Sequence, residues 1–145
     1  MKKEFTIFYT DDDLDDLDFF TEVVDSMEDN VELVTQNNGK KLLEALNNPP
    51  PSPSIIFLDL NMPGINGLDV LAEIRKSNCP KSLPVIILST SNDDKIIDRS
   101  LNLGANFYIT KPNDFVSLKK SIEHSININW NSFTPNKDNF VYLNN

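Results

Sequence analysis

Five short apolar segments alternate with helical patterns along the chain, and this alternation constrains the fold more than any other feature. The apolar segments are residues 5–9, 31–35, 55–58, 85–88 and 106–109. The third and fourth, IIFL and VIIL, are apolar at every position, which is typical of strands covered on both faces. β-branched residues, which favour strands, are frequent in three of the segments. We therefore predict five strands.

Apolar residues at helical spacing occupy the stretches between these strands. Leu14, Leu17, Phe20, Val24 and Met27 form the first such face. The other faces comprise Leu42, Leu43 and Leu46, then Leu68, Leu71 and Ile74, then Ile96, Ile97 and Leu101, and last Phe115, Leu118, Ile122 and Ile126. Either Asn113 or Asp114 can cap the last helix. Repeated βα units predict an α/β fold in which helices cover both faces of a parallel sheet.

Composition restricts the classes of function. A length of 145 residues suits one domain, and a net charge of −9 without a basic stripe argues against direct binding to nucleic acid. Cys79 is the single cysteine, so an internal disulfide cannot form. The apolar run after Lys2 and Lys3 is too short for a signal peptide, and no stretch is long enough to cross a membrane. We therefore expect a cytoplasmic protein without a membrane partner.

Polar residues follow the predicted strands where each strand ends. Asp11 and Asp12 follow the first strand, Asp59 the third, Ser89 the fourth and Lys111 the fifth. Because parallel strands end at the same edge of a sheet, these side chains should converge. Clustered carboxylates repel one another unless a cation relieves them, and Mg²⁺ suits such oxygen ligands. A carboxylate nucleophile beside Mg²⁺ and an ammonium group is typical of a site that accepts a phosphoryl group.

These residues lie in the segments IFYTDDD, IIFLDLNMPGINGLDVLAEIR, PVIILSTS and GANFYITKP. With them, the chain resembles the receiver domain of two-component response regulators over about residues 4–128. The resemblance implies a flavodoxin-like (βα)5 sandwich with strand order 2-1-3-4-5. It also implies a receiver domain over residues 1–129, followed by an extension over residues 130–145 that contains no output domain.

The resemblance assigns the phosphoryl acceptor and the metal ligands. Asp59 is the acceptor and also contacts Mg²⁺. Asp12 binds the cation directly, Asp11 binds it largely through water, and Asn61 supplies its backbone carbonyl.

Three further residues receive roles from the resemblance. Lys111 pairs with the phosphoryl group, Ser89 is the switch hydroxyl that bonds it, and Tyr108 is the aromatic switch residue. Pro112 follows Lys111, as in the family pattern. Thr10 departs from that pattern, which has an aliphatic residue more often, and Ser89 stands where threonine is commoner.

The resemblance also implies the partners. A sensor histidine kinase or a phosphotransfer protein is the donor, and a downstream protein contact or onward phosphorelay is the output. The chain itself would catalyse only its own phosphorylation and dephosphorylation, as a monomer or weak homodimer.

Two other functions compete with this interpretation. A phosphatase of the haloacid-dehalogenase type also uses an aspartate nucleophile with Mg²⁺, but it needs a second aspartate where this chain has Asn61. A receiver that binds partners without phosphorylation is the third possibility. The presence of Asp59, Ser89 and Lys111 together argues against it.

Several neighbouring polar residues have simpler interpretations. Asp13, Asp15, Asp16 and Asp18 are expected to favour the start of a helix or to form a solvated face. Ser89, Thr90 and Ser91 are all suitable caps for the fourth helix, and Ser91 is also a candidate for tuning dephosphorylation. His124 is expected to lie on the surface.

The final segment is rich in aromatic residues, with Trp130, Phe133, Phe140 and Tyr142. This is more than a disordered segment usually contains. We expect the segment to pack on the receiver or on a second copy, with the stretch from Phe140 to Leu143 pairing as a short strand or filling an apolar groove.

Overall fold

The computed structural model describes residues 5–27, 30–47, 54–62, 64, 66–77 and 83–143. The strands are β1 (Phe5–Thr10), β2 (Val31–Gln36), β3 (Ser54–Leu58), β4 (Val85–Ser89) and β5 (Phe107–Thr110). The helices are α1 (Leu14–Asp25), α2 (Gly39–Asn47), α3 (Gly67–Lys76), α4 (Asp94–Asn102) and α5 (Phe115–Ile126). Cys79 lies outside the described residues.

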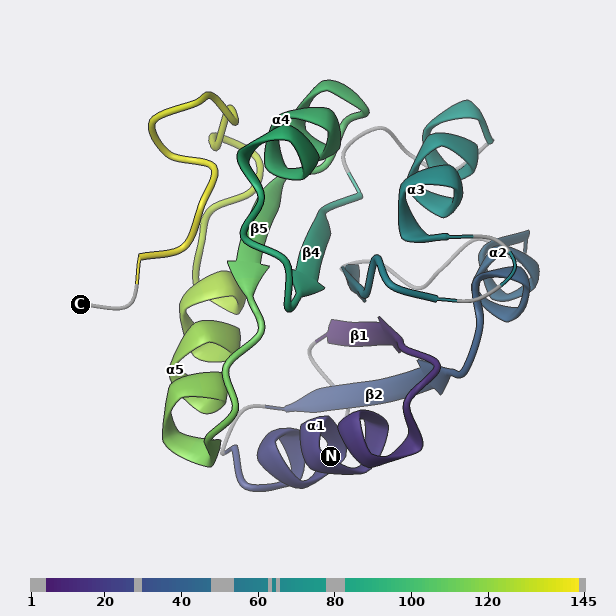
Figure 1. Ribbon diagram of the computed structural model, residues 1–145. Coiled ribbons are helices and arrows are strands. Elements are labelled where there is room, and N and C mark those ends of the chain that lie inside the picture. The colour runs from purple at the N-terminus through teal and green to yellow at the C-terminus, as the bar shows by residue number, and fades with distance from the viewer. Residues whose placement is uncertain are drawn as a thin grey trace.

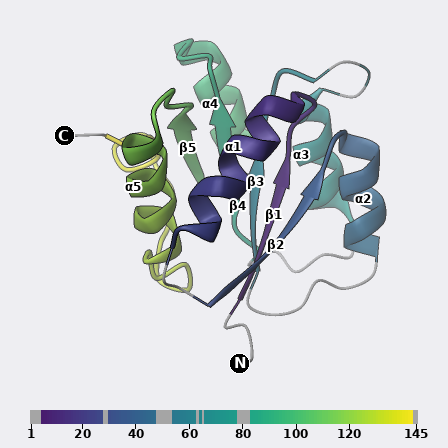
Figure 2. The same ribbon diagram turned by 90° about the horizontal axis from the view of Figure 1, so that it is seen from below.

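The five strands form one parallel sheet in the order β2-β1-β3-β4-β5, which confirms the predicted fold (Figure 1). Helices α1 and α5 cover one face, and α2, α3 and α4 cover the other (Figure 2). The central strands β3 and β4 are buried at every position, as their uninterrupted apolar sequence predicts.

Alternate residues of each strand supply two separate cores. On β1, Ile7 and Tyr9 pack with Leu17 and Phe20 of α1. Phe8, which points the other way, packs with Leu42 of α2 and its neighbours. Since side chains alternate along a strand, a single apolar segment packs against helices on both faces of the sheet.

Two apolar residues at helix starts do not join the core that their spacing predicts. Leu14 is 65% exposed and Phe115 is 38% exposed. Each is the first residue of its helix, beyond the carboxyl ends of the strands, so less of the sheet lies beneath it. Phe115 makes only an edge contact with Phe19, with ring centroids 6.4 Å apart.

Aspartates cap three of the helices. Asp13 accepts hydrogen bonds from the backbone of Asp15 and Asp16, and Asp114 accepts one from Ser117. The cap of α4 is Asp93, rather than Ser89, Thr90 or Ser91. None of the three hydroxyl residues that could cap this helix does so, because β4 continues through Ser89 and a loop precedes the helix.

The tail after α5 folds back onto the edge strand β5 (Figure 1). The Tyr108 N–H donates to the Phe140 carbonyl at 2.9 Å, and the Tyr142 N–H donates to the Tyr108 carbonyl at 2.8 Å. Phe140 is 1% exposed. These contacts confirm that the tail packs on the same chain, with a short parallel pairing at its end. In the parts of the chain that the structure describes, no helix has the length and apolar character needed to span a membrane.

Candidate phosphoryl-acceptor site

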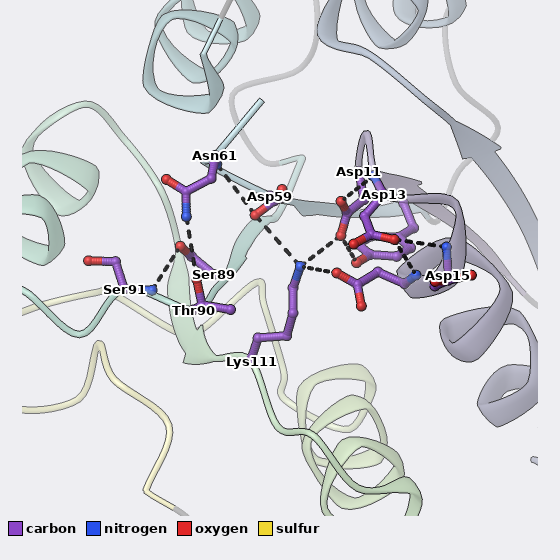
Figure 3. A network of polar contacts seen from close by, with 11 residues as sticks. Asp11, Asp13, Asp15, Asp59, Asn61, Ser89, Thr90, Ser91 and Lys111 are labelled. Atoms are coloured by element: carbon purple, nitrogen blue, oxygen red, sulfur yellow. Dashed lines mark hydrogen bonds and ion pairs between the residues drawn. The ribbon is translucent and has the colours of Figure 1, made fainter. Parts of the chain in front are cut away.

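The strand ends gather the predicted polar side chains at one edge of the sheet (Figure 3). Asp11 follows β1, Asp59 follows β3, Ser89 ends β4 and Lys111 follows β5. Backbone hydrogen bonds extend the ladder past the strand ends, since the Asp59 N–H donates to Thr10 and the Lys111 N–H donates to Ser89. The positions of these side chains are therefore fixed by the sheet itself.

Three carboxylates form the acidic part of the site. One oxygen from each of Asp11, Asp12 and Asp59 lies within 4.8 Å of the others. Asp11 and Asp59 are buried, whereas Asp12 is exposed and opens the cluster to solvent. Hard divalent cations prefer oxygen ligands in this number and spacing, so the donor set fits Mg²⁺ or a similar ion.

Lys111 reaches into the same cluster from β5. Its Nζ donates to Asp11 at 2.8 Å and to Asp16 at 3.0 Å, and it lies 3.8 Å from Asp59 Oδ1. Burial lowers the pKa of Lys111, but the hydrogen bond to Asp11 and the charge of Asp59 outweigh it and raise the pKa overall. The lysine is therefore held as a cation beside the Asp59 carboxylate.

Burial dominates the electrostatics of Asp59. It raises the pKa of this carboxyl to about 7, against the lowering effect of Lys111 and with a further rise from Asp11. The backbone N–H of Asn61 donates to Asp59 Oδ1 at 3.4 Å and lowers the pKa slightly. A bound cation near Asp59, in addition to Lys111, would favour the ionised form of this carboxyl.

Close packing positions the loop that carries Asp59. Helix α3 begins at Gly67, where a Cβ atom would lie 2.5 Å from the Asp59 carbonyl oxygen and from Leu60 Cα. The Gly67 N–H donates to the Leu60 carbonyl at 3.0 Å. Only glycine permits this approach, so Gly67 fixes the turn between Asp59 and helix α3.

The remaining predicted residues lie along the β4 side of the site. The Asn61 amide donates to Thr90 Oγ1 at 3.4 Å, and the Ser91 N–H donates to Ser89 Oγ at 3.3 Å (Figure 3). Ser89 is fully buried. Tyr108 is also fully buried, and its hydroxyl donates to the Ser91 carbonyl at 2.6 Å. Burial raises the pKa of Tyr108 above its ordinary value.

Tyr9 and Asp16 also contact the predicted site residues, although nothing in the local sequence pattern distinguishes them. The Tyr9 hydroxyl donates to Asp11, and burial together with the Asp11 charge raises the pKa of Tyr9. Tyr9 looks like an ordinary core residue of a strand, so no local pattern singles it out. Asp16 is one of several acids in the first turn of α1, and only the fold shows which of them meets Lys111.

His124 lies on α5, away from the acidic cluster. It is exposed, as expected, but it also stacks on Phe107 with centroids 5.8 Å apart and contacts Tyr142 at 5.1 Å. The histidine is thus part of the contact between helix and tail.

Comparison with known proteins gives a consistent result. The model of the response regulator receiver domain matches residues 7–123. Response regulator Rcp1 of Synechocystis sp. is 38% identical over 73 residues, which are 50% of this chain and 50% of that protein. The probable methanogenesis regulatory protein FilR2 of Methanothrix harundinacea is 35% identical over 71 residues, 49% of this chain and 46% of that protein. The matched segment spans about half the length of these curated relatives.

Solved structures extend the similarity over most of the chain. The phosphorylated cyanobacterial phytochrome response regulator RcpA has a TM-score of 0.73 and 31% identity, covering 93% of this chain and 98% of that one. The Mn²⁺-bound form of Rcp1 has a TM-score of 0.72 and 28% identity, covering 90% and 98%.

Proposed function

The chain belongs to the family of response regulator receiver domains, and on this premise we propose that it accepts a phosphoryl group on Asp59 in a Mg²⁺-dependent reaction. The donor is a phosphohistidine of a sensor histidine kinase or a phosphotransfer protein. The observation that carries the proposal is the position of Asp59, which is buried within 4.8 Å of two further carboxylates and 3.8 Å from the Lys111 ammonium.

The transfer needs an ionised Asp59. One carboxylate oxygen attacks phosphorus while the phosphorus–nitrogen bond breaks, and the electron pair of that bond returns to the imidazole. The pKa of about 7 leaves much of Asp59 protonated in the metal-free site, so a bound cation would increase the reactive fraction.

Asp11, Asp12, Asp59 and the backbone carbonyl of Asn61 would hold Mg²⁺. When bound, the cation supplies positive charge to the phosphoryl oxygens. The Mn²⁺-bound form of the related Rcp1 supports a divalent ion in such a site. Among the acids of the cluster, Asp12 is the exposed one, and it gives the cation a route from solvent.

Lys111 and Ser89 would contact the phosphoryl group once it is attached. The ammonium is a mobile point charge that can follow a phosphoryl oxygen. The Ser89 hydroxyl is buried and would have to turn toward the site. The Ser91 N–H donates to Ser89 Oγ, and the Tyr108 hydroxyl donates to the Ser91 carbonyl. A movement of Ser89 would therefore alter the hydrogen bonding of Tyr108, the proposed aromatic switch residue.

The output of this change is a contact with a downstream protein or onward phosphotransfer. We assign residues 1–129 to the receiver domain and residues 130–145 to an extension. We propose that the chain catalyses only its own phosphorylation and dephosphorylation. A haloacid-dehalogenase-type phosphatase is disfavoured, since the Asn61 side chain is an amide that donates to Thr90 and cannot act as an acid or base.

Phosphotransfer from a histidine kinase or from a small phosphodonor tests the proposal. Wild-type protein should gain one phosphoryl group only when Mg²⁺ is present, and Asp59→Asn should gain none. Labelling of the variant at the wild-type rate, or labelling that chelation leaves unchanged, would refute it.

A further inference from the structure

One carboxylate that the proposed reaction does not use contacts Lys111 directly. Asp16 lies in the first turn of α1, and its Oδ2 is 3.0 Å from Lys111 Nζ. Asp11 accepts from the same ammonium at 2.8 Å, whereas the Asp59 oxygen is 3.8 Å away. Of the three N–H groups of the ammonium, two are therefore directed to the α1 side of the site.

The contact with Asp16 holds Lys111 Nζ closer to Asp11 and Asp16 than to Asp59. A phosphoryl group on Asp59 would draw the ammonium toward its own oxygens, and the lysine would have to release one of its partners. Asp11 belongs to the cation cluster, so its charge is shared with the metal. Asp16 lies outside that cluster. In the described residues, its ion-pair partner is Lys111.

We propose that Asp16 is a positioning residue that holds Lys111 on the α1 side of the site until a phosphoryl group on Asp59 displaces it. The inference rests on the proposed function of Asp59. It implies that Asp16 competes with the phosphoryl group for one ammonium. The charge of Asp16 therefore weakens the hold of the protein on that group and favours the unphosphorylated state.

Asp16 differs in this respect from the other acids at the start of α1. Asp13 caps the helix through hydrogen bonds from Asp15 and Asp16. Asp15 shares the first turn with Asp16 and is exposed. Asp15 and Asp16 both lie where the helix dipole favours negative charge, but of the two it is Asp16 that forms an ion pair with Lys111. Asp15→Asn is therefore a matched control that removes a charge from the same turn without touching Lys111.

The experiment measures the affinity of the full chain for beryllofluoride, a phosphoryl mimic, by calorimetry at saturating Mg²⁺. Asp16→Asn should bind the mimic about three- to fivefold more tightly than wild type, as expected for a partly exposed ion pair that no longer competes. Asp15→Asn should stay within about twofold of wild type. Asp16→Glu, which restores the charge, should return most of the wild-type affinity.

Equal affinities of Asp16→Asn and Asp15→Asn would overturn the inference, as would weaker binding by Asp16→Asn. In either case wild-type binding that requires Mg²⁺ and Asp59 would leave the proposed function intact. If wild type does not bind the mimic in this manner, the proposed function fails and the inference fails with it. Thermal melting of each variant confirms that the comparison is made between folded proteins.

Discussion

β5 separates two regions of opposite character, the acidic strand edge and the aromatic tail. At its carboxyl end, the strand leads into Lys111, which neutralises part of a buried group of carboxylates. Along its free edge, the same strand pairs through Tyr108 with Phe140 and Tyr142 of the tail. The first region collects charges that repel one another, and the second collects rings that attract one another.

The tail joins the two cores of the protein around the end of the sheet. Trp130, Phe133 and Tyr142 surround Phe107 on one face, with ring centroids between 6.1 and 6.3 Å from it. Phe140 packs on Tyr108 on the other face. The tail also covers an edge strand that would otherwise present unpaired backbone groups. We therefore expect the tail to stabilise the fold, whereas the buried carboxylates of the acidic edge should cost stability.

Of the changes considered for the two regions, removal of the tail should have the largest effect on stability. A chain ending at Asn129 loses the aromatic cluster around Phe107 and the backbone bonds of Tyr108. The melting temperature should fall by about 10 °C or more, because several rings lose their burial. Phosphorylation at Asp59 should persist in the cold. Equal melting temperatures in calorimetry would mean that the tail contributes nothing to stability.

A single side chain should reproduce much of this loss. Phe140→Ala removes a ring that is 1% exposed and should lower the free energy of unfolding by about 3–5 kcal/mol. Leu143→Ala removes a side chain that is 71% exposed and should change it by about 0.5 kcal/mol or less. Urea unfolding of both variants measures the difference. Similar losses in the two would contradict the packing of Phe140 described above.

At the acidic edge, removal of a charge should instead stabilise the protein. Burial raises the pKa of Asp59 from 3.8 to about 7, so the folded state holds this proton more tightly than the unfolded state does. The resulting stability is present below pH 3.8 and is lost as the pH rises through 7. Asp59→Asn avoids that loss. At pH 8, the free energy of unfolding of the variant should exceed that of wild type by on the order of 1–3 kcal/mol, whereas at pH 4 the two should be similar.

Mg²⁺ provides the control for this prediction. The cation should stabilise wild type through binding. It should therefore reduce the difference in unfolding free energy between Asp59→Asn and wild type at pH 8. Chemical unfolding at both pH values, with and without Mg²⁺, measures the effect. A gap that is the same at pH 4 and pH 8 would show that the Asp59 charge is not the cause.

The sequence predicts the acidic strand edge in more detail than the contacts of the aromatic tail. All five strands lie within one residue of their predicted bounds at each end. Short apolar segments rich in β-branched residues, such as VIIL, suit strands. The convergence of Asp11, Asp59 and Lys111 follows from the topology of a parallel sheet alone. These features depend on local pattern and on a rule that applies to every fold of this class.

Specific contacts between segments that are distant in the sequence could not be predicted from it. The pairing of Val141 with Tyr108 depends on where the tail turns, and the aromatic composition does not fix that turn. The pairing of Lys111 with Asp16 depends on the rotation of α1 about its axis, which several neighbouring aspartates leave open. Residue type also does not identify the cap of α4. Ser89, Thr90 and Ser91 are suitable caps by type, but the helix begins after Asp93.

Reductive trapping of the phosphorylated protein tests the central claim most directly. Borohydride reduces an acyl phosphate to an alcohol and releases phosphate, so a phosphorylated aspartate is converted to homoserine. After phosphotransfer in the presence of Mg²⁺, peptide mass spectrometry should find homoserine at position 59 and intact aspartate at Asp11 and Asp12. Homoserine at either of those positions, or reduction that occurs equally without a phosphodonor, would contradict the assignment of Asp59 as the acceptor.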